Sequence, residues 1–337
     1  MTTPGTAGRS GTRTDLAARF VIRAATLAPS VHNTQPWRFG ISGDAFQLYA
    51  DVRHRLPATD PAGREMVISC GAALFNLRLA MRMLGFAARV TPFPDPGRDD
   101  LLAEIRWGWN RPPSLHEQSL FRVMSRRHTH RGMFLDTAVP AYLLAALEGA
   151  AQSEDARLVF VQDEPRLDRL GALVGEAERR ERADPGIAAE LARWTPAPGD
   201  GRLDGVPAHA YPRQPDGARL ATRDFAMGTA RGHVPRVRRS CPATQGVVAV
   251  LATRGDRRLD WLRAGSALQS VLLHGAAHRI SAAFHTQPLE LPDLRAHIEH
   301  DIGTGGHPQM LLRLGYTDRT RSTPRRPVGE VLVDRAV

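Results

Sequence analysis

A polar loop between two prolines carries side chains well suited to ligand binding. Residues 29–36 read Pro-Ser-Val-His-Asn-Thr-Gln-Pro. Pro29 ends the preceding helical pattern and Pro36 keeps Gln35 extended, because proline lacks an N–H and restricts the residue before it. The loop then offers three short hydrogen-bonding side chains on a stiff frame, those of Ser30, Asn33 and Gln35. A flat ligand with polar edges fits such a loop, and so does an ordinary helix-to-strand turn with polar caps.

A basic run at residues 126–131 is the first candidate for binding an anion. It places Arg127, Thr129 and Arg131 at alternate positions. In an extended segment two guanidinium groups and the hydroxyl between them would point the same way. This pattern predicts a phosphate site, although taken alone it also fits a solvated basic run.

The C-terminal tail offers a second pair of guanidinium groups. Arg325 and Arg326 stand between Pro324 and Pro327, which keep the segment extended. The pair is a further candidate for phosphate binding, or an ordinary basic tail.

The charge of the chain narrows the possible chemistry. The net charge is +10 over 337 residues, and all 45 basic residues are arginine, because the sequence contains no lysine. Lysine Schiff-base and lysine-base chemistry are therefore excluded, and bidentate phosphate recognition is favoured. Nucleic acid is the rival partner. The arginines are scattered among acidic residues without a helix-turn-helix pattern, so we expect no nucleic-acid binding.

The composition favours a cytoplasmic protein. The chain has two cysteines, Cys70 and Cys241, which lie far apart in the sequence. We therefore expect a protein of a reducing compartment, without a disulfide framework. No run of eighteen apolar residues is present, so we expect no membrane span. Residues 1–14 are polar and rich in Gly and Thr, and we expect a disordered arm and not a signal peptide.

An internal duplication is indicated by two long apolar helical segments. Residues 71–79 and 265–273 share Gly, Ala, Leu and Leu at the same offsets. In the first half the segment is preceded by a helix-to-strand unit at Leu16–Leu48, with its strand at Arg38–Leu48, and followed by a strand-like stretch at Leu101–Trp107. In the second half the corresponding unit is Tyr142–Gln162 and the corresponding stretch is Gln309–Gly315. A repeat this long predicts two copies of one domain. Helix packing alone would also favour these small and aliphatic residues.

The whole loop is more specific than its parts. It resembles the P-S-x-x-N-x-Q-P-W-x-F segment of the FMN-dependent nitroreductase family, with matches at Pro29, Ser30, Asn33, Gln35, Pro36, Trp37 and Phe39. The resemblance is strongest to the actinobacterial, internally duplicated Acg-type branch. It implies an α+β nitroreductase-like fold in two tandem copies, which form a pseudo-dimer within one chain, so that a monomer suffices. We expect the first copy at 15–112, the second at 113–337 with a junction near Trp109–Leu115, and a lid insertion at 182–243.

The resemblance also implies one FMN site per chain. The family's R-x-[ST]-x-[RK] motif matches at 127–131 and its tail motif at 325–326, whereas the corresponding loop of the second copy, at 150–157, is shortened and acidic. In the first copy only residues 9–13 resemble the Arg motif. The implied cofactor-binding residues are Pro29, Ser30, Val31, Asn33, Gln35, Arg127, His128, Thr129, Arg131, Thr286, Gln287, Arg325 and Arg326.

The implied activity is ping-pong hydride transfer through FMN. NAD(P)H would reduce the flavin at N5 and leave, and a small nitroaromatic or quinone would then accept the electrons. No side chain is implied as catalytic; a backbone N–H near Thr286 and Gln287 would face N5, although the family's usual Glu-Gly pair is missing there. The alternative is a protein that stores flavin in an occluded cleft, with the insertion as its cover. Trp194 and Tyr211 would then lie over the flavin, unless the insertion is a surface excursion.

The sequence contains no complete metal-binding motif. His274 and His278 are spaced one helical turn apart without a carboxylate or an HExxH pattern, and His297, His300 and Asp301 are likewise incomplete. We therefore expect no metal site.

Overall fold

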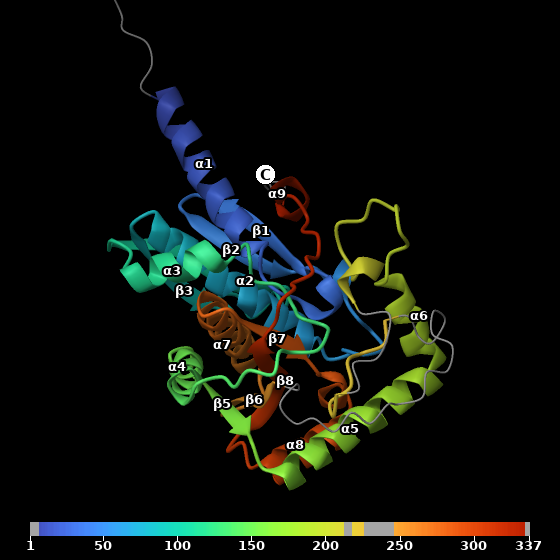
Figure 1. Ribbon diagram of the computed structural model, residues 1–337. Coiled ribbons are helices and arrows are strands. Elements are labelled where there is room, and N and C mark those ends of the chain that lie inside the picture. Colours follow the sequence, from blue (N-terminus) through green and yellow to red (C-terminus); the bar gives the residue numbers. More distant parts are fainter. Residues whose placement is uncertain (1–6, 212–217, 226–245, 334–337) are drawn as a thin grey trace, which may run out of the picture.

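The computed structural model describes residues 7–211, 218–225 and 246–333, with side chains from Asp15 onward (Figure 1). Residues 1–6 of the expected arm lie outside the described residues. So do 212–217 and 226–243 of the expected insertion, including Cys241.

The first half of the chain is one α+β unit. Its elements are α1 (Ala7–Ala25), β1 (Trp37–Ser42), β2 (Ala45–Ala50), α2 (Arg64–Met83), β3 (Phe86–Pro92) and β4 (Leu101–Asn110), with short 3-10 turns η1 (Val31–Asn33) and η2 (Val52–His54). The four strands form an antiparallel sheet in the order β1-β2-β4-β3.

The second half repeats this unit with additions. The repeated elements are α4 (Ala141–Gln152), β5 (Ala156–Val161), β6 (Val247–Thr253), α7 (Arg258–Ala277), β7 (Ile280–Phe284) and β8 (His307–Tyr316). The additions are α3 (Leu115–Val123), α5 (Glu164–Ala183), α6 (Pro185–Arg193), η3 (Ala208–Ala210), η5 (Gln287–Leu289), α8 (Pro292–Ile302) and α9 (Val328–Val331). The sheet order is β5-β6-β8-β7, which matches the first sheet strand for strand. The predicted duplication is confirmed. Strand β6 is an unbroken apolar run in the sequence, a pattern that predicts a buried strand.

Two local predictions are wrong. The single strand expected over Arg38–Leu48 is a hairpin, because Gly43 adopts a left-handed φ of 60° and turns the chain. Helix α1 begins at Ala7, so the arm expected through residue 14 is helical from residue 7. Nucleation is the unfavourable step of helix formation, so extending an existing helix by a turn costs little free energy. The partial Arg motif at 9–13 consequently lies on a helix and not on an extended segment.

The two halves meet where α2 crosses α7 at the centre of the molecule (Figure 1). Gly71 and Gly265, the glycines matched by the sequence repeat, lie at this crossing. A Cβ on Gly71 would stand 2.1 Å from the Leu262 carbonyl oxygen, and one on Gly265 would stand 1.9 Å from that of Ile68. Nearby, Gln269 Nε2 donates to Asn76 Oδ1 at 2.7 Å. The repeated glycines therefore allow the two copies to approach closely.

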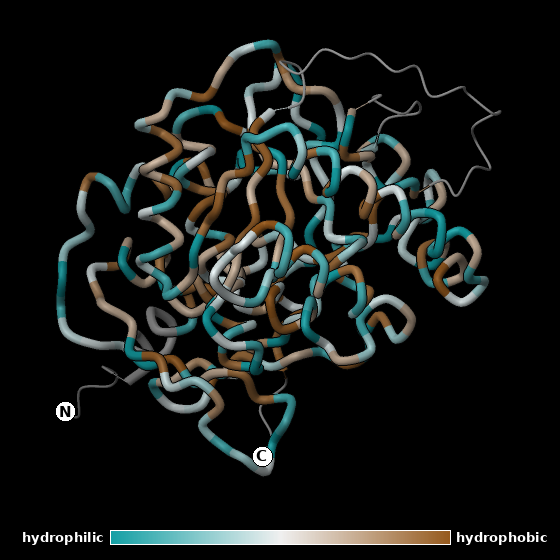
Figure 2. Tube along the Cα trace, turned by 90° about the horizontal axis from the view of Figure 1, so that it is seen from below, coloured by the Kyte–Doolittle hydropathy of each residue, from teal (hydrophilic) through white to brown (hydrophobic). Residues whose placement is uncertain are grey.

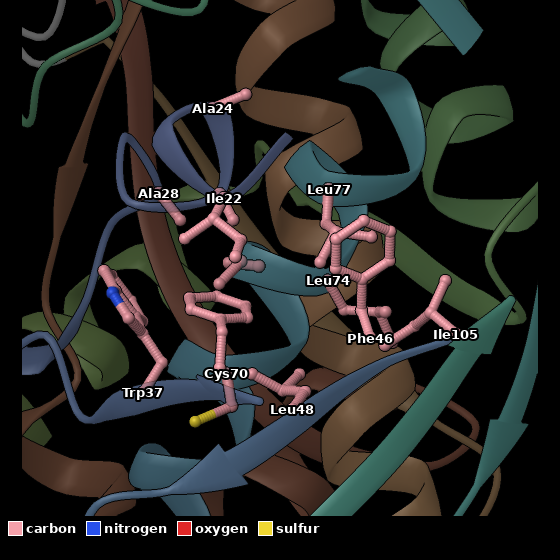
Figure 3. Close-up of a cluster of buried hydrophobic side chains, with 14 of the residues drawn as sticks. Ile22, Ala24, Ala28, Trp37, Phe46, Leu48, Cys70, Leu74, Leu77 and Ile105 are labelled. Carbon is pink, nitrogen blue, oxygen red and sulfur yellow. The ribbon is translucent and has the colours of Figure 1, made fainter. Parts of the chain in front are cut away.

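Each half has its own apolar core. In the first, Trp37 of β1, Ile22 of α1 and Leu77 of α2 are fully buried, and Figure 3 shows them within one cluster between helices and sheet. The interior strands are also the most hydrophobic part of the trace in Figure 2. Within the described part of the chain, α2 alone has the length and hydropathy of a membrane span, and 78% of that stretch is buried in the fold.

The tail returns to the first half. After β8 the chain runs back across the molecule, where Leu332 pairs with Phe39 of β1 and Val333 N donates to Phe39 O at 2.8 Å. The segment between β5 and β6, which includes the expected insertion, stands where the first copy has the tight β1–β2 turn. Its helix α5 packs against α6 and α8 (Figure 1). Tail and insertion thus both reach the region between the two copies.

Candidate functional site

The loop after α1 is held in a strained shape. His32, Asn33 and Gln35 have φ values of 46°, 55° and 51°, a region that residues other than glycine rarely adopt. The extended conformation expected of Gln35 before Pro36 is therefore wrong. Ser30 Oγ accepts the Gln35 N–H at 2.9 Å. Each such conformation costs on the order of 1–3 kcal/mol, so the surrounding structure must enforce it. Such strain is typical of a ligand-binding loop.

This loop forms one wall of a pocket between the two copies. The first copy contributes the loop and the start of α2. The second copy contributes the segment before α4, the end of β7 and part of the insertion. The pocket contains about 720 Å³ of empty space, part of it open to solvent. It is lined by Pro29, Ser30, Val31, His32, Glu65, Ile68, Ser69, Thr129, His130, Arg131, Thr222, Arg223, Phe225, Phe284, Thr286, Gln287 and Met310.

Three buried arginines form a cationic cluster beside this pocket. Arg131 lines the pocket, whereas Arg127, Arg325 and the neighbouring His128 do not. Burial, with the charges of Arg325 and Arg131, lowers the pKa of Arg127 to about 9. Burial and Arg325 lower the pKa of Arg131 to about 10, and burial lowers that of Arg325 to about 10. The three guanidinium groups are therefore close enough to repel one another. None of them forms an ion pair with a carboxylate among the described residues.

The cluster also contains donors without acceptors. In the described part of the chain, the Nε–H groups of Arg127 and Arg325 have no acceptor, and Nδ1 of His128 has no hydrogen-bond partner. Burial, with the charge of Arg127, lowers the pKa of His128 to about 4, so its imidazole is neutral at pH 7. Burying like charges with unmet donors is costly unless an anion completes the site. The cluster, which includes His128, is built for an anion such as a phosphate.

The extended segment reaches the pocket, but not with the alternation that its spacing predicts: Thr129, His130 and Arg131 line it, whereas Arg127 does not. Thr129 pairs with Ala282 of β7 in a parallel bridge, and His130 N donates to Ala282 O at 2.8 Å. This anchoring brings Thr129 and Arg131 to the pocket wall together. Arg131 lies 5.7 Å from the centre of the Phe225 ring, so the guanidinium group stacks on an insertion side chain.

The end of β7 supplies the opposite wall. Thr286 and Gln287 line the pocket, as the sequence suggested. Gln287 is 1% exposed, and its Nε2 has no partner among the described residues. Its amide is therefore a further donor available to a ligand.

Three expected ligand-binding residues are used differently. Asn33 Nδ2 donates to Gly205 O at 2.9 Å and Gln35 Nε2 donates to Leu203 O at 2.7 Å. These bonds fasten the insertion to the loop. Arg326 N donates to the Gln35 Oε1 atom at 2.8 Å, and its guanidinium group contacts Glu330. Asn33, Gln35 and Arg326 do not line the pocket, and their side chains join loop, insertion and tail.

Several pocket residues carried no signal in the sequence. Glu65 belongs to the first turn of α2, where an acidic residue is ordinary. Arg223 and Phe225 lie in the irregular insertion. Arg223 contacts His32 Nε2 at 2.9 Å and the carboxylates of Glu181 and Glu290 at 3.1 and 2.5 Å. The insertion is therefore locked to both the loop and the second copy.

The aromatic groups expected over the pocket are also placed differently. Trp194 is buried 5.6 Å from the His54 ring and does not line the pocket. Tyr211 lies 5.7 Å from Phe225 in a small core within the insertion. Phe225, and neither of the two predicted residues, faces the pocket.

Comparison with known proteins identifies the family. No protein-family model matches the chain. The Mycobacterium tuberculosis protein named "Putative NAD(P)H nitroreductase Rv3131" is 34% identical over 322 residues, which span 93% of the chain and 90% of that relative. The M. tuberculosis protein named "Putative NAD(P)H nitroreductase acg" is 29% identical over 94% of the chain and 96% of its own length. A crystal structure described as a putative nitroreductase from Anabaena variabilis aligns over 95% of the chain and 90% of its own, with 12% identity and a TM-score of 0.49. The chain belongs to the Acg-type branch of the nitroreductase family.

Proposed function

We propose that the chain is an FMN-dependent oxidoreductase that passes electrons from NAD(P)H to a small nitroaromatic or quinone. The observation that carries this proposal is the cluster of Arg127, Arg131 and Arg325, with its unmet donors, at a pocket built by both copies. A phosphate group would satisfy that cluster, and the adjoining pocket offers both polar and apolar side chains to a ring system.

The residues present fit FMN. Arg127 and Arg325 would bind the phosphate, and Thr129 would place a hydroxyl between guanidinium groups. Arg131 lines the pocket proper, where its charge would stabilise negative charge on a reduced ring. When bound, FMN would supply hydride acceptance and donation at N5, and the protein would supply orientation and electrostatics.

The experiment is an anaerobic reduction. Purified protein is loaded with FMN, and NADH or NADPH is added while flavin absorbance is followed. We expect bleaching by one nucleotide and recovery on adding a quinone. Protein that binds FMN but resists both nucleotides would contradict the oxidoreductase proposal.

Flavin storage is the second candidate, favoured by the position of the insertion. Thr222, Arg223 and Phe225 form part of the pocket wall, and the bonds from Asn33 and Gln35 hold the insertion in place. A fastened cover would retain FMN and exclude acceptors together. Replacing residues 195–235 with a short Gly/Ser linker should then speed both FMN release and quinone reduction. Unchanged release and unchanged turnover in a folded deletion variant would contradict a covering role.

A further inference from the structure

A buried carboxyl group at the pocket has an oxygen without a partner. Glu65, the second residue of α2, is 3% exposed and lines the pocket. Its Oε1 accepts from Arg64 Nη2 at 3.1 Å, whereas its Oε2 has no hydrogen-bond partner in the described structure. An unsatisfied buried carboxyl oxygen is costly, so its place at a ligand pocket requires an explanation.

The fold itself does not require an acid at this position. The repeat that matches Gly71 with Gly265 places Leu259 opposite Glu65, and both are the second residue of their helix. The second copy, which carries the three arginines, therefore has an apolar side chain at the equivalent position. Of these two positions, Glu65 of the first copy is the one that lines the pocket.

Three other ionisable side chains of the pocket, those of His32, Arg131 and Arg223, are poor proton donors. His32 is fully enclosed, and burial together with Arg223 lowers its pKa well below the usual value, so it is neutral at pH 7. Its Nε2 already contacts Arg223 at 2.9 Å. His130 Nε2 is 2.9 Å from Met133 O. Arg131 and Arg223 do not release protons near neutral pH.

Glu65 differs from these groups. Burial, with the charges of Glu290 and Asp60, raises its pKa well above the usual value. Arg64 and Arg223 act in the opposite direction without outweighing burial. Burial therefore favours the protonated carboxyl, and Oε2, which has no partner among the described residues, is the oxygen that can present a proton to the pocket.

We propose that Glu65 is the general acid that protonates the electron acceptor, an inference that rests on the oxidoreductase function proposed above. Two-electron reduction of a quinone consumes one hydride, which comes from NAD(P)H by way of the flavin, and one proton. The O–H bond of Glu65 breaks, and an O–H bond forms on the quinone oxygen that did not receive the hydride. Glu65 remains as a carboxylate beside the Arg64 guanidinium group until a proton from solvent restores the acid.

The covered pocket gives this role a physical reason. The insertion residues Thr222, Arg223 and Phe225 close part of the wall. Water reaches such a site less freely than it reaches an open cleft, so an internal acid is useful. General acid catalysis typically contributes about 10²–10⁴-fold to a rate.

The test compares E65Q with E65L. Glutamine keeps the shape without a transferable proton, and leucine is the residue that the other copy carries. Each FMN-loaded protein is reduced with dithionite and mixed with 1,4-benzoquinone in a stopped-flow instrument. We expect both variants to bind FMN within about threefold of the wild type and to reoxidise about 100-fold more slowly or worse. A second measurement uses flavin-free protein: the infrared carbonyl band of a protonated carboxyl at pH 7 should lose intensity in E65Q.

The outcomes separate the two proposals. Unchanged reoxidation in E65Q, or an unchanged infrared band, overturns the proton-donor role. Loss of FMN binding in both variants, in parallel with the rate, would assign Glu65 a structural role and overturn it as well. A wild type that binds FMN but never reoxidises with any quinone or nitroaromatic overturns the oxidoreductase function itself, and this inference with it.

Discussion

Replacing Arg127 with methionine (R127M) is expected to stabilise the flavin-free protein while weakening its FMN complex. Arg127 is 5% exposed, its Nε has no partner in the described structure, and burial beside other arginines lowers its pKa to about 9. Replacing a buried charge with an apolar side chain of similar volume typically stabilises by about 1–4 kcal/mol. The lost hydrogen bond to Leu27 O, 3.3 Å long, offsets about 1 kcal/mol of this gain.

FMN binding should change in the opposite direction. A charge-assisted hydrogen bond to phosphate contributes about 1.5–3 kcal/mol, so the Kd for FMN should rise about 10- to 150-fold. Riboflavin has no phosphate, and its Kd should be nearly unchanged. The assay combines thermal unfolding of flavin-free protein with fluorescence titration of both flavins.

A matched control is Arg326→Met. Arg326 is almost as buried, at 8% exposed, but it donates to Glu330 O at 2.9 Å and to Gln35 O at 3.3 Å. Its replacement should lower the Tm and affect both flavins alike. If R127M instead lowers the Tm, or weakens FMN and riboflavin equally, Arg127 is a structural residue and the phosphate assignment fails.

Three further perturbations test the fold, the pH response and the insertion. Gly71→Ala should cost about 3 kcal/mol or more in urea unfolding, because its Cβ would stand 2.1 Å from a backbone oxygen of α7. Gly149→Ala on α4, with open space around it, should be neutral or stabilising; equal effects would refute the close crossing. Burial raises the pKa of Glu181 to about 7, so the folded state binds its proton more tightly and the free energy of unfolding should fall as pH rises from about 4.5 to about 7. E181Q should flatten that slope, and an unaltered slope would show that other groups cause it. Asn33→Gly, which the φ of 55° tolerates, removes the bonds to Gly205 O and from Arg325 Nη1 and should speed FMN release about 2- to 13-fold; an unchanged off-rate would mean that these bonds do not hold the cover.

Much of the fold could be predicted from local patterns. The apolar run at Val247–Thr253 and the glycines of the two long helices depend on burial and close packing, which leave a direct signature in residue type. The hairpin at Gly43 was missed because its two strands read as one alternating segment when the turn is only two residues long. The start of α1 was missed because residues 7–14 have no apolar periodicity of their own.

The site could be predicted in part from spacing along one segment. Thr129 and Arg131 line the pocket, but His130 between them lines it too and Arg127 does not. The alternation therefore points to the segment and not to the exact set of residues. Asn33 and Gln35 were assigned to the ligand because nothing in the sequence indicates that residues 203–205 lie beside them. Glu65 and Phe225 reach the pocket only through tertiary packing, so no local pattern identified them.

The number of FMN molecules bound per chain is the most direct test of the central claim. That claim is that the chain has one working FMN site, built by both copies. Flavin-free protein is titrated with FMN in a calorimeter, and the stoichiometry is compared between the wild type and R127M. We expect about one equivalent for the wild type and the same endpoint with weaker binding for R127M. Two equivalents would contradict the single site, because the shortened loop at 150–157 would then form a second one. A wild type that binds no FMN would contradict the assignment of the arginine cluster to its phosphate.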